Sequence, residues 1–114
     1  MNLAELQVDL RHFAAERDWQ SFHTPKNLAM ALSVEAAELL ECFQWLTPAQ
    51  SAALGARDRH AVEEEVADVL LYLLRLTDVL DIDLLRAAQR KMAVNARKYP
   101  VSRARGSARK YSRR

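Results

Sequence analysis

The chain has 114 residues, half of them hydrophobic, and Ala, Leu, Glu and Arg dominate a composition with only two glycines and three prolines. Such a length corresponds to one domain with a proper core, and this composition favours helices. No apolar run approaches the roughly 18 residues that a membrane span requires. The charged N-terminal region lacks the apolar segment of a signal peptide, and the single cysteine, Cys42, cannot form an internal disulfide. We therefore expect a cytoplasmic protein without a membrane segment.

The formal net charge of +2 conceals two parts of opposite sign. Residues 1–96 carry 9 basic and 15 acidic side chains, whereas the chain from Arg97 onward carries eight basic side chains and no acidic one. The last 14 residues are also small, polar and without periodicity. The sequence therefore predicts one domain over residues 1–100 and a basic tail over residues 101–114.

A first helix is expected over residues 3–17, where leucines and a phenylalanine share one face at helical spacing. A short polar loop follows and contains Trp19, Phe22 and His23. Two aromatic side chains in such a loop indicate either an anchor into the core or a stacking platform for a ring.

The second helix carries the most informative feature of the chain. Thr24 and Pro25 fit the N-cap and the first helical position, and the helix is expected to continue to the end of residues 28–46. The apolar residues of this run fall on one side when each residue is turned through about 100°. Glu35 projects from the middle of that apolar stripe, and Glu38 lies one turn further on, at its edge. A carboxylate against a core is costly unless it is paired or binds a cation.

A third helix repeats this feature. A short turn follows Thr47 and ends at Gly55, and Asp58 is expected to cap the third helix. Within residues 62–80 of that helix, two acids at i, i+3 flank the apolar stripe. These acids are Glu65 and Asp68, beside Tyr72, whereas Arg75 and Asp78 are expected on the polar side.

The fourth helix is expected to begin after Asp83 as its N-cap and to end at Pro100, with Lys91 and Asn95 one turn apart. Four helices with short connections predict an all-α four-helix bundle. The third helix is more apolar than a surface helix of a monomer requires. We therefore expect a homo-oligomer, either a dimer or a tetramer.

The two acidic pairs together predict a metal site. Glu35, Glu38, Glu65 and Asp68 can meet between the helices as an all-oxygen cage, which suits a hard cation such as Mg²⁺, with Mn²⁺ as a substitute. No histidine stands three residues after a helical glutamate, which disfavours zinc and redox chemistry. Mg²⁺ usually keeps waters and bridges to substrate phosphates, and no P-loop is present. The expected substrate is therefore a polyphosphate, and the protein is not expected to be an ordinary ATPase.

The acidic motifs also resemble a known family. Glu35-x-x-Glu38 followed by Glu64-Glu65-x-x-Asp68, each on a long helix, resembles the all-α nucleoside triphosphate pyrophosphohydrolases, the MazG-like superfamily. The stretches that resemble its dCTP pyrophosphatase branch are residues 13–28, 43–46, 64–73, 91–100 and 106–111. The resemblance implies Mg²⁺-dependent hydrolysis of a nucleoside triphosphate, dCTP or a modified dCTP, to the monophosphate and pyrophosphate, as in nucleotide-pool sanitation.

The resemblance also implies roles for individual residues. By position, the Mg²⁺ ligands would be Glu35, Glu38, Glu65 and Asp68. The residues around the base would be Trp19, His23 and Trp45, and those lining the sugar and phosphates would be Tyr72, Lys91 and Asn95. Among the acids, we take Glu38 as the candidate catalytic base and Glu35 as the second catalytic residue. In the branch a base-pocket histidine stands nine residues before the tryptophan at position 19. Leu10 occupies that position here, so the chain departs from the branch at a residue that bears on the implied preference for cytosine or its 5-methylated form.

The basic tail supports an alternative hypothesis, a non-enzymatic nucleic-acid-binding module. Eight cations in the last 18 residues of the chain would bind phosphate backbones with a marked salt dependence. The other readings are a solvated tail that keeps the protein soluble and a segment that folds over a neighbouring subunit's site. The sequence favours the enzyme over the nucleic-acid binder and leaves the preferred base, the number of metal ions and the role of the tail open.

Overall fold

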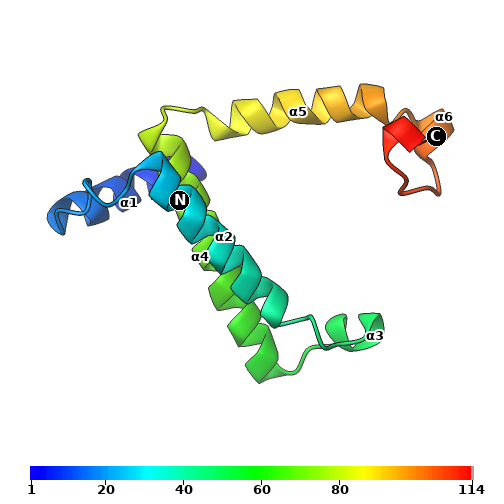
Figure 1. The fold of residues 1–114 in the computed structure, drawn as a ribbon, viewed down its shortest axis with the longest axis horizontal. Helices are drawn as coiled ribbons and strands as arrows, with labels where there is room; N and C mark the ends of the chain where they lie inside the picture. Colours follow the sequence, from blue (N-terminus) through cyan, green and yellow to red (C-terminus); the bar gives the residue numbers. More distant parts are fainter. Residues whose placement is uncertain (114) are drawn as a thin grey trace. The chain divides into compact units, whose positions relative to one another are not determined.

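A computed structural model describes residues 1–113 and shows an all-α protein (Figure 1). The long helices are α1 (Leu3–Glu16), α2 (Pro25–Glu41), α4 (Ala56–Val79) and α5 (Leu84–Lys98). The short ones are α3 (Pro48–Ser51), α6 (Val101–Ala104) and the 3₁₀ helix η1 (Tyr111–Arg113). The described residues contain no strand, so the predicted all-α class is confirmed. None of the described helices is long and apolar enough to cross a membrane.

The helices begin where capping chemistry places them. The side chain of Asn2 caps α1, and the side chains of Thr24 and Asp83 accept hydrogen bonds from backbone N–H groups in the first turns of α2 and α5. Thr47 forms a reciprocal capping box with Gln50 at the start of α3. Each cap satisfies a backbone donor that has no partner within its own helix. The expected caps of α2 and α5 are therefore confirmed.

The expected cap of the third helix is wrong. Helix α4 begins at Ala56 with Gly55 in the N-cap position, and no side chain caps it. Asp58 lies within the first turn instead. A carboxylate in the first turn is still favourable there because it faces the positive end of the helix dipole. A first-turn acid and a capping acid therefore look alike in a sequence.

The expected end of the second helix is also wrong. Helix α2 ends at Glu41, five residues before the expected position. The N–H groups of Cys42 and Phe43 bond to carbonyls three residues back, at 3.1 and 2.9 Å, which is the tighter pattern of a 3₁₀ turn. Residues 42–45 then form turns, and the chain bends at Leu46. With neither glycine nor proline in this stretch, only the geometry of the last turns reveals where the helix ends.

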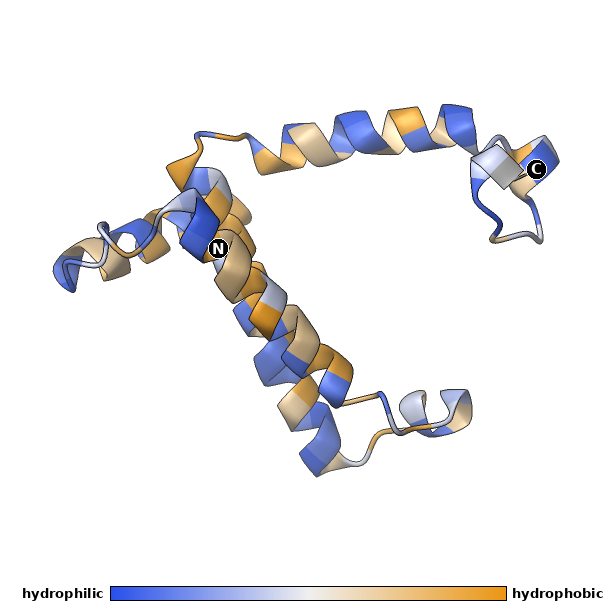
Figure 2. Cartoon of the chain, viewed as in Figure 1, coloured by the Kyte–Doolittle hydropathy of each residue, from blue (hydrophilic) through white to orange (hydrophobic). Residues whose placement is uncertain are grey.

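The chain divides into two compact units, of which the first, Met1–Asp81, contains α1 to α4. Helices α2 and α4 run side by side, and α1 packs on α4 (Figure 1). The first turns of α4 are hydrophilic and its later turns hydrophobic (Figure 2). The apolar core accordingly includes Leu74 in the later part of α4, together with Leu28 of α2 and Ala14 of α1.

Polar contacts fix α1 on the later part of α4. Gln7 donates from Nε2 to the carbonyl of Leu74 at 3.1 Å and to Oγ1 of Thr77 at 3.3 Å. Four residues further along α1, Arg11 donates two hydrogen bonds to the carboxylate of Asp78, at 2.9 and 2.7 Å. A guanidinium that binds both oxygens of a carboxylate fixes orientation as well as distance. These contacts hold α1 at the position from which it lines the candidate site.

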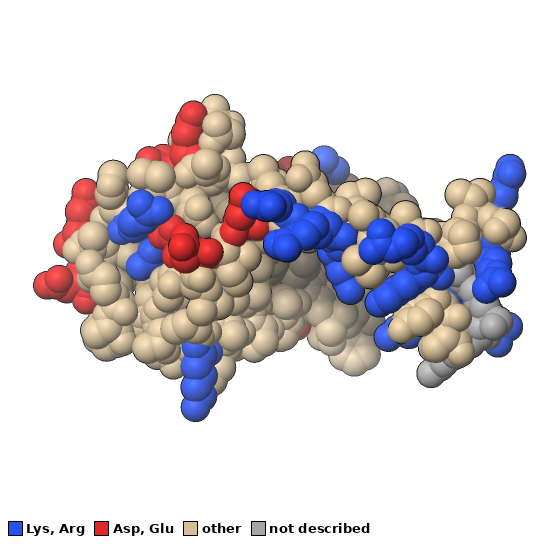
Figure 3. Space-filling view, turned by 90° about the horizontal axis from the view of Figure 1, so that it is seen from above, with Lys and Arg blue, Asp and Glu red and all other residues tan. Residues whose placement is uncertain are grey.

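The second unit begins at Ile82 and contains α5, α6 and η1. The ring of Tyr111 meets the ring of Tyr99 edge to face with centroids 5.9 Å apart, and Nζ of Lys98 lies 4.9 Å from the centroid of the Tyr111 ring. Lys and Arg side chains gather over this unit, whereas most Asp and Glu lie on the first unit (Figure 3). Within residues 101–113 of the basic tail, the structure places α6 and η1, although the sequence there shows no periodicity. A domain boundary at residue 100 and the packing of α5 as the fourth helix of a bundle stay predictions.

Candidate active site

Three carboxylates meet on the facing sides of α2 and α4. Oxygen atoms of Glu35, Glu38 and Glu65 all lie within 4.8 Å of one another, and all three residues are partly buried. Glu35 and Glu38 stand one turn apart on the side of α2 that faces α4, as side chains at i, i+3 do. The structure thus brings together three of the four acids whose meeting the sequence predicts. We call these three residues the acid cluster.

The fourth acid, Asp68, lies one turn after Glu65 and outside this close group. Its negative charge still raises the pKa of both Glu35 and Glu65, so it is close enough to act on the acid cluster. Asp68 also lines a neighbouring pocket. It is therefore the residue that connects the acid cluster to that pocket.

The acid cluster lacks positive partners. Oε2 of Glu35 and Oε2 of Glu65 are buried and accept no hydrogen bond from any described residue. Within the described part of the chain, no basic side chain forms an ion pair with any of the three acids. Buried acceptors without partners are costly, and natural proteins rarely leave them so.

The pKa values of Glu35 and Glu65 respond to this arrangement. Burial, followed by the neighbouring carboxyl groups of Glu38 and Glu65, raises the pKa of Glu35 to about 7. Burial and the charge of Glu38 likewise raise the pKa of Glu65. A cation among these oxygens would offset both effects, since it supplies the partner that the buried oxygens need and neutralises the repulsion between the carboxylates. The donor set contains only oxygen, which fits a hard divalent cation.

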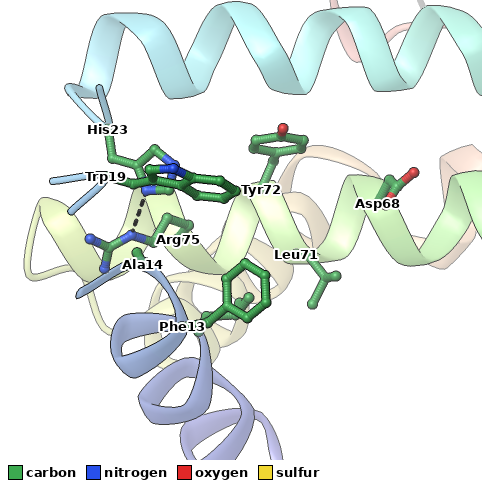
Figure 4. Close-up of a pocket in the computed structure, with 9 residues that line it drawn as sticks. Phe13, Ala14, Trp19, His23, Asp68, Leu71, Tyr72 and Arg75 are labelled. Atoms are coloured by element: carbon green, nitrogen blue, oxygen red, sulfur yellow. Dashed lines mark hydrogen bonds between the residues drawn. The ribbon is translucent and has the colours of Figure 1, made fainter. Parts of the chain in front are cut away.

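A cavity of about 160 Å³ lies beside the acid cluster, between α1, α4 and the loop that joins α1 to α2 (Figure 4). Its lining is mostly apolar and aromatic. The lining residues are Leu10, Phe13, Ala14, Trp19, His23, Asp68, Leu71, Tyr72 and Arg75. An apolar pocket with a few convergent polar groups next to perturbed carboxylates is the usual form of a small-molecule site.

Aromatic rings form one wall of this pocket. Trp19 meets Phe13 edge to face with centroids 5.7 Å apart, and it meets His23 in the same way at 5.9 Å. Trp19 remains 40% exposed, so a ligand can reach its ring. Phe22 is 65% exposed and does not anchor the loop in the core. The loop is held instead by its backbone, since the N–H of Trp19 donates to the carbonyl of Ala14 at 3.0 Å.

Arg75 is buried, which contradicts its expected place on the polar side of its helix. Only 8% of the residue is exposed. Its Nε donates to Nδ1 of His23 at 3.0 Å, and its Nη1 donates to Oδ2 of Asp78 at 3.1 Å. The expectation failed because α1 crosses α4 here and its Arg11 pairs with Asp78, so the polar face of an isolated helix lies inside the fold.

These contacts also shift two pKa values. Burial, and next the charge of Arg75, lower the pKa of His23. The hydrogen bonds from Arg11 and the charges of both arginines lower the pKa of Asp78 despite its burial. The two shifts favour the neutral ring of His23 and the carboxylate form of Asp78.

The remaining residues expected in the site are placed differently. Trp45 is 86% exposed and does not line the pocket of Trp19. Lys91 and Asn95 lie on α5 in the second unit, so their part in the site stays a prediction. Several lining residues were not assigned to the site from the sequence. Of these, Arg75 is the one that the sequence could best have indicated, because a basic residue three positions before an acid stands out within an apolar helix.

Comparison with known proteins gives a consistent result. The model of a family described as MazG-like matches residues 30–113, which contain all four acids but neither Trp19 nor His23. Human dCTP pyrophosphatase 1 is 48% identical over 102 residues, and the bovine protein of the same name is 47% identical over 102 residues. Each match covers 88% of this chain and 60% of the relative. The chain thus spans about three fifths of the length of these curated relatives.

A solved structure shows the same fold. The crystal structure of a pyrophosphatase from Archaeoglobus fulgidus superposes with a TM-score of 0.81 at 50% sequence identity. The likeness covers 85% of this chain and 91% of that chain. Most of the fold of this chain is therefore shared with a protein that has been solved independently.

Proposed function

The chain belongs to the MazG-like family, and from this premise we propose that it hydrolyses a nucleoside triphosphate, dCTP or a modified dCTP, to the monophosphate and pyrophosphate. The observation that carries the proposal is the acid cluster without positive partners beside an aromatic pocket, with Asp68 belonging to both. A triphosphate on a flat base needs both features, a cation site for the phosphates and a ring-lined pocket for the base. The names of the relatives support dCTP as the substrate. Nucleotide-pool sanitation is the role that the family resemblance implies.

We assign Mg²⁺ to the acid cluster, with Asp68 as a fourth ligand and Mn²⁺ as a substitute. The two unpartnered oxygens of Glu35 and Glu65 support this assignment. When bound, the ion supplies positive charge to the phosphate oxygens, which favours attack at phosphorus and departure of pyrophosphate. The acids themselves must stay ionised to bind it, so the raised pKa of Glu35 describes the metal-free protein.

The other residues bind and orient the substrate. Trp19 offers a ring for stacking on the base, His23 contacts the edge of the base, and Tyr72 packs against the sugar. Glu38 accepts the proton of the attacking water. For Trp45, Lys91 and Asn95 we keep the roles that the family resemblance implies, with Lys91 supplying a positive charge to the phosphates.

We also propose that the protein works as a homo-oligomer. Large apolar side chains are exposed on the first unit, among them Met30, Val34 and Leu40 on or near α2 and Val66 on α4, each at least half exposed. A second copy of the chain would cover them. The free thiol of Cys42 fits the cytoplasmic location that the sequence predicts.

Pyrophosphate release tests the proposal. The protein is incubated with dCTP, 5-methyl-dCTP, dTTP, dATP and dGTP, with Mg²⁺ or with EDTA, and the products are separated. We expect the monophosphate and pyrophosphate from the cytosine nucleotides, in Mg²⁺ only. Release of orthophosphate and a diphosphate, or no turnover by a folded protein with any nucleotide, would refute the proposal.

Deletion of residues 101–114 separates the enzyme from the alternative, a nucleic-acid binder that uses the basic segment. An enzyme with a passive basic segment keeps its turnover after the deletion. A nucleic-acid binder loses its salt-dependent retention on DNA. Loss of turnover together with unchanged DNA binding would place this segment in the active site.

A further inference from the structure

Four side chains form a continuous line of hydrogen bonds from the surface to the pocket. Arg11 on α1 donates to Asp78, and Asp78 also accepts from Arg75. Arg75 in turn donates to His23, which lines the pocket; Figure 4 shows this last contact. Three of these residues, Arg75, Asp78 and His23, are at least partly buried. We call these four residues the arginine relay.

We propose that Arg75 is a positioning residue that holds His23 in the tautomer with its hydrogen on Nε2, so that the pocket presents a hydrogen-bond donor to its ligand. The 3.0 Å contact joins Nε of Arg75 to Nδ1 of His23. A guanidinium has only donors and stays protonated, so the nitrogen that it contacts must be the acceptor. A neutral imidazole whose Nδ1 accepts carries its hydrogen on Nε2.

The alternative states of the ring are costly in this geometry. A hydrogen on Nδ1 would point two N–H groups at each other across 3.0 Å. A doubly protonated ring would add a positive charge next to the guanidinium, and the charge of Arg75 already lowers the pKa of His23. A nearby acid could favour a charged ring, and Asp68 is the acid that lines the same pocket. No ion pair joins Asp68 to His23 among the described residues.

The rest of the arginine relay keeps Arg75 in place. Asp78 binds Nη1 of Arg75 at 3.1 Å and binds Arg11 at 2.9 and 2.7 Å. The planar guanidinium is thereby fixed at one edge by Asp78 while its Nε meets His23. Because Asp78 has a second partner in Arg11, it is not left unpaired when Arg75 is replaced.

The tautomer decides what the pocket can recognise. Nε2 of His23 has no partner among the described residues, and as a donor it fits an acceptor such as a carbonyl oxygen or an unprotonated ring nitrogen of a base. This consequence rests on the proposed nucleotide function, whereas the tautomer itself does not. The pocket would then disfavour a base that presents an N–H group to His23, because two donors would face each other.

Nitrogen-15 NMR of the ligand-free protein tests the tautomer. The protein is labelled with ¹⁵N-histidine, and the His23 signals are identified by their loss in His23→Gln. We expect wild-type Nδ1 to behave as an unprotonated nitrogen and Nε2 as a protonated one. In Arg75→Met, which removes the donor and leaves Asp78 paired with Arg11, we expect a mixture of both tautomers. The matched control is Arg59→Met, on the same helix but in an exposed ion pair with Glu63, and it should leave the His23 signals unchanged.

Two results would overturn the inference. One is a wild-type His23 with its hydrogen on Nδ1, and this result needs no variant, so it decides the matter even if Arg75→Met does not fold. The other is an Arg75→Met protein whose His23 keeps the wild-type tautomer.

Kinetics tests the consequence for the ligand. We expect Arg75→Met to raise KM about tenfold, the size of one lost hydrogen bond, with little change in kcat. An equal loss in kcat with KM unchanged would refute the role in recognition. If the wild-type protein releases no pyrophosphate from any nucleotide, the proposed function fails while the NMR result stands. If it does release pyrophosphate but His23 shows the opposite tautomer, the present inference fails alone.

Discussion

The acid cluster predicts that removing one of its charges makes the metal-free protein more stable and the enzyme inactive. Glu35→Gln keeps the shape of the side chain and removes its negative charge. Oε2 of Glu35 is buried, accepts no hydrogen bond from residues 1–113, and lies next to the oxygens of Glu38 and Glu65. In the absence of a cation, the wild-type carboxylate is therefore repelled by its neighbours and deprived of water, whereas the amide is not.

The raised pKa gives the size and the sign of the effect. A rise from 4.5 to about 7 corresponds to about 3 kcal/mol at full strength. Because Glu35 is only partly buried, solvent screening reduces this to about 1 kcal/mol. A raised carboxyl pKa means that the folded state binds the proton more tightly. The stability that the protonated carboxyl group of Glu35 contributes is complete below its ordinary pKa and is lost as the pH rises through about 7.

Thermal unfolding in EDTA and in Mg²⁺ measures this effect. In EDTA, at a pH above the raised pKa, we expect Glu35→Gln to melt about 4 to 8 °C higher than the wild type, and we expect no such difference at acid pH. In Mg²⁺ the wild type should gain stability by binding the ion, and the variant should gain much less and release no pyrophosphate. Glu41→Gln, an exposed acid on the same helix, is the control and should melt like the wild type in both buffers. A Glu35→Gln protein no more stable than the wild type in EDTA would refute the account of the acid cluster.

Three further predictions concern the pocket, the arginine relay and the exposed face of α2. Asp78→Asn should lower the free energy of unfolding near neutral pH by about 1 to 3 kcal/mol, because Arg11 and Arg75 lose their acceptor. The pKa of Asp78 is lowered in the fold, so this loss should vanish as the pH falls through the lowered value; urea titrations at neutral and acid pH would show an unchanged difference if the reasoning were wrong. Trp19→Ala should weaken nucleotide binding by about 1 to 3 kcal/mol, read as KM, with Trp19→Phe close to wild type, and equal KM values for all three would exclude stacking. Val34→Glu should lower the mass measured by light scattering, and an unchanged mass would place the interface elsewhere.

The acid cluster could be predicted from the sequence because its cause is local. Two acids three residues apart on the apolar stripe of a helix must point the same way, whatever that helix packs against. When two helices share this pattern and pack side by side, their acids meet. Glu35, Glu38 and Glu65 follow this logic, and the structure places them within 4.8 Å of one another.

The pocket could not be derived in the same way because its cause is tertiary. Arg75 belongs to the polar face of α4 when that helix is considered alone, and it is buried only because α1 crosses there. No periodicity within α4 encodes that crossing. The end of α2 escaped prediction for a related reason, since its last turns tighten without the glycine or proline that usually marks a helix end.

Helix α4 contains two kinds of buried charge, and the difference between them locates the chemistry. At its later end, Asp78 is partly buried but receives three hydrogen bonds from two arginines, so the polar group is satisfied by the protein itself. About four turns earlier, Glu65 is partly buried with an oxygen that nothing in the described chain satisfies. Both are acids on an apolar helix, and in the sequence they look alike. A satisfied network stabilises the fold and orients a neighbour, whereas an unsatisfied one requires a partner from outside the chain. This difference supports the proposed cation site at Glu65 and argues against one at Asp78.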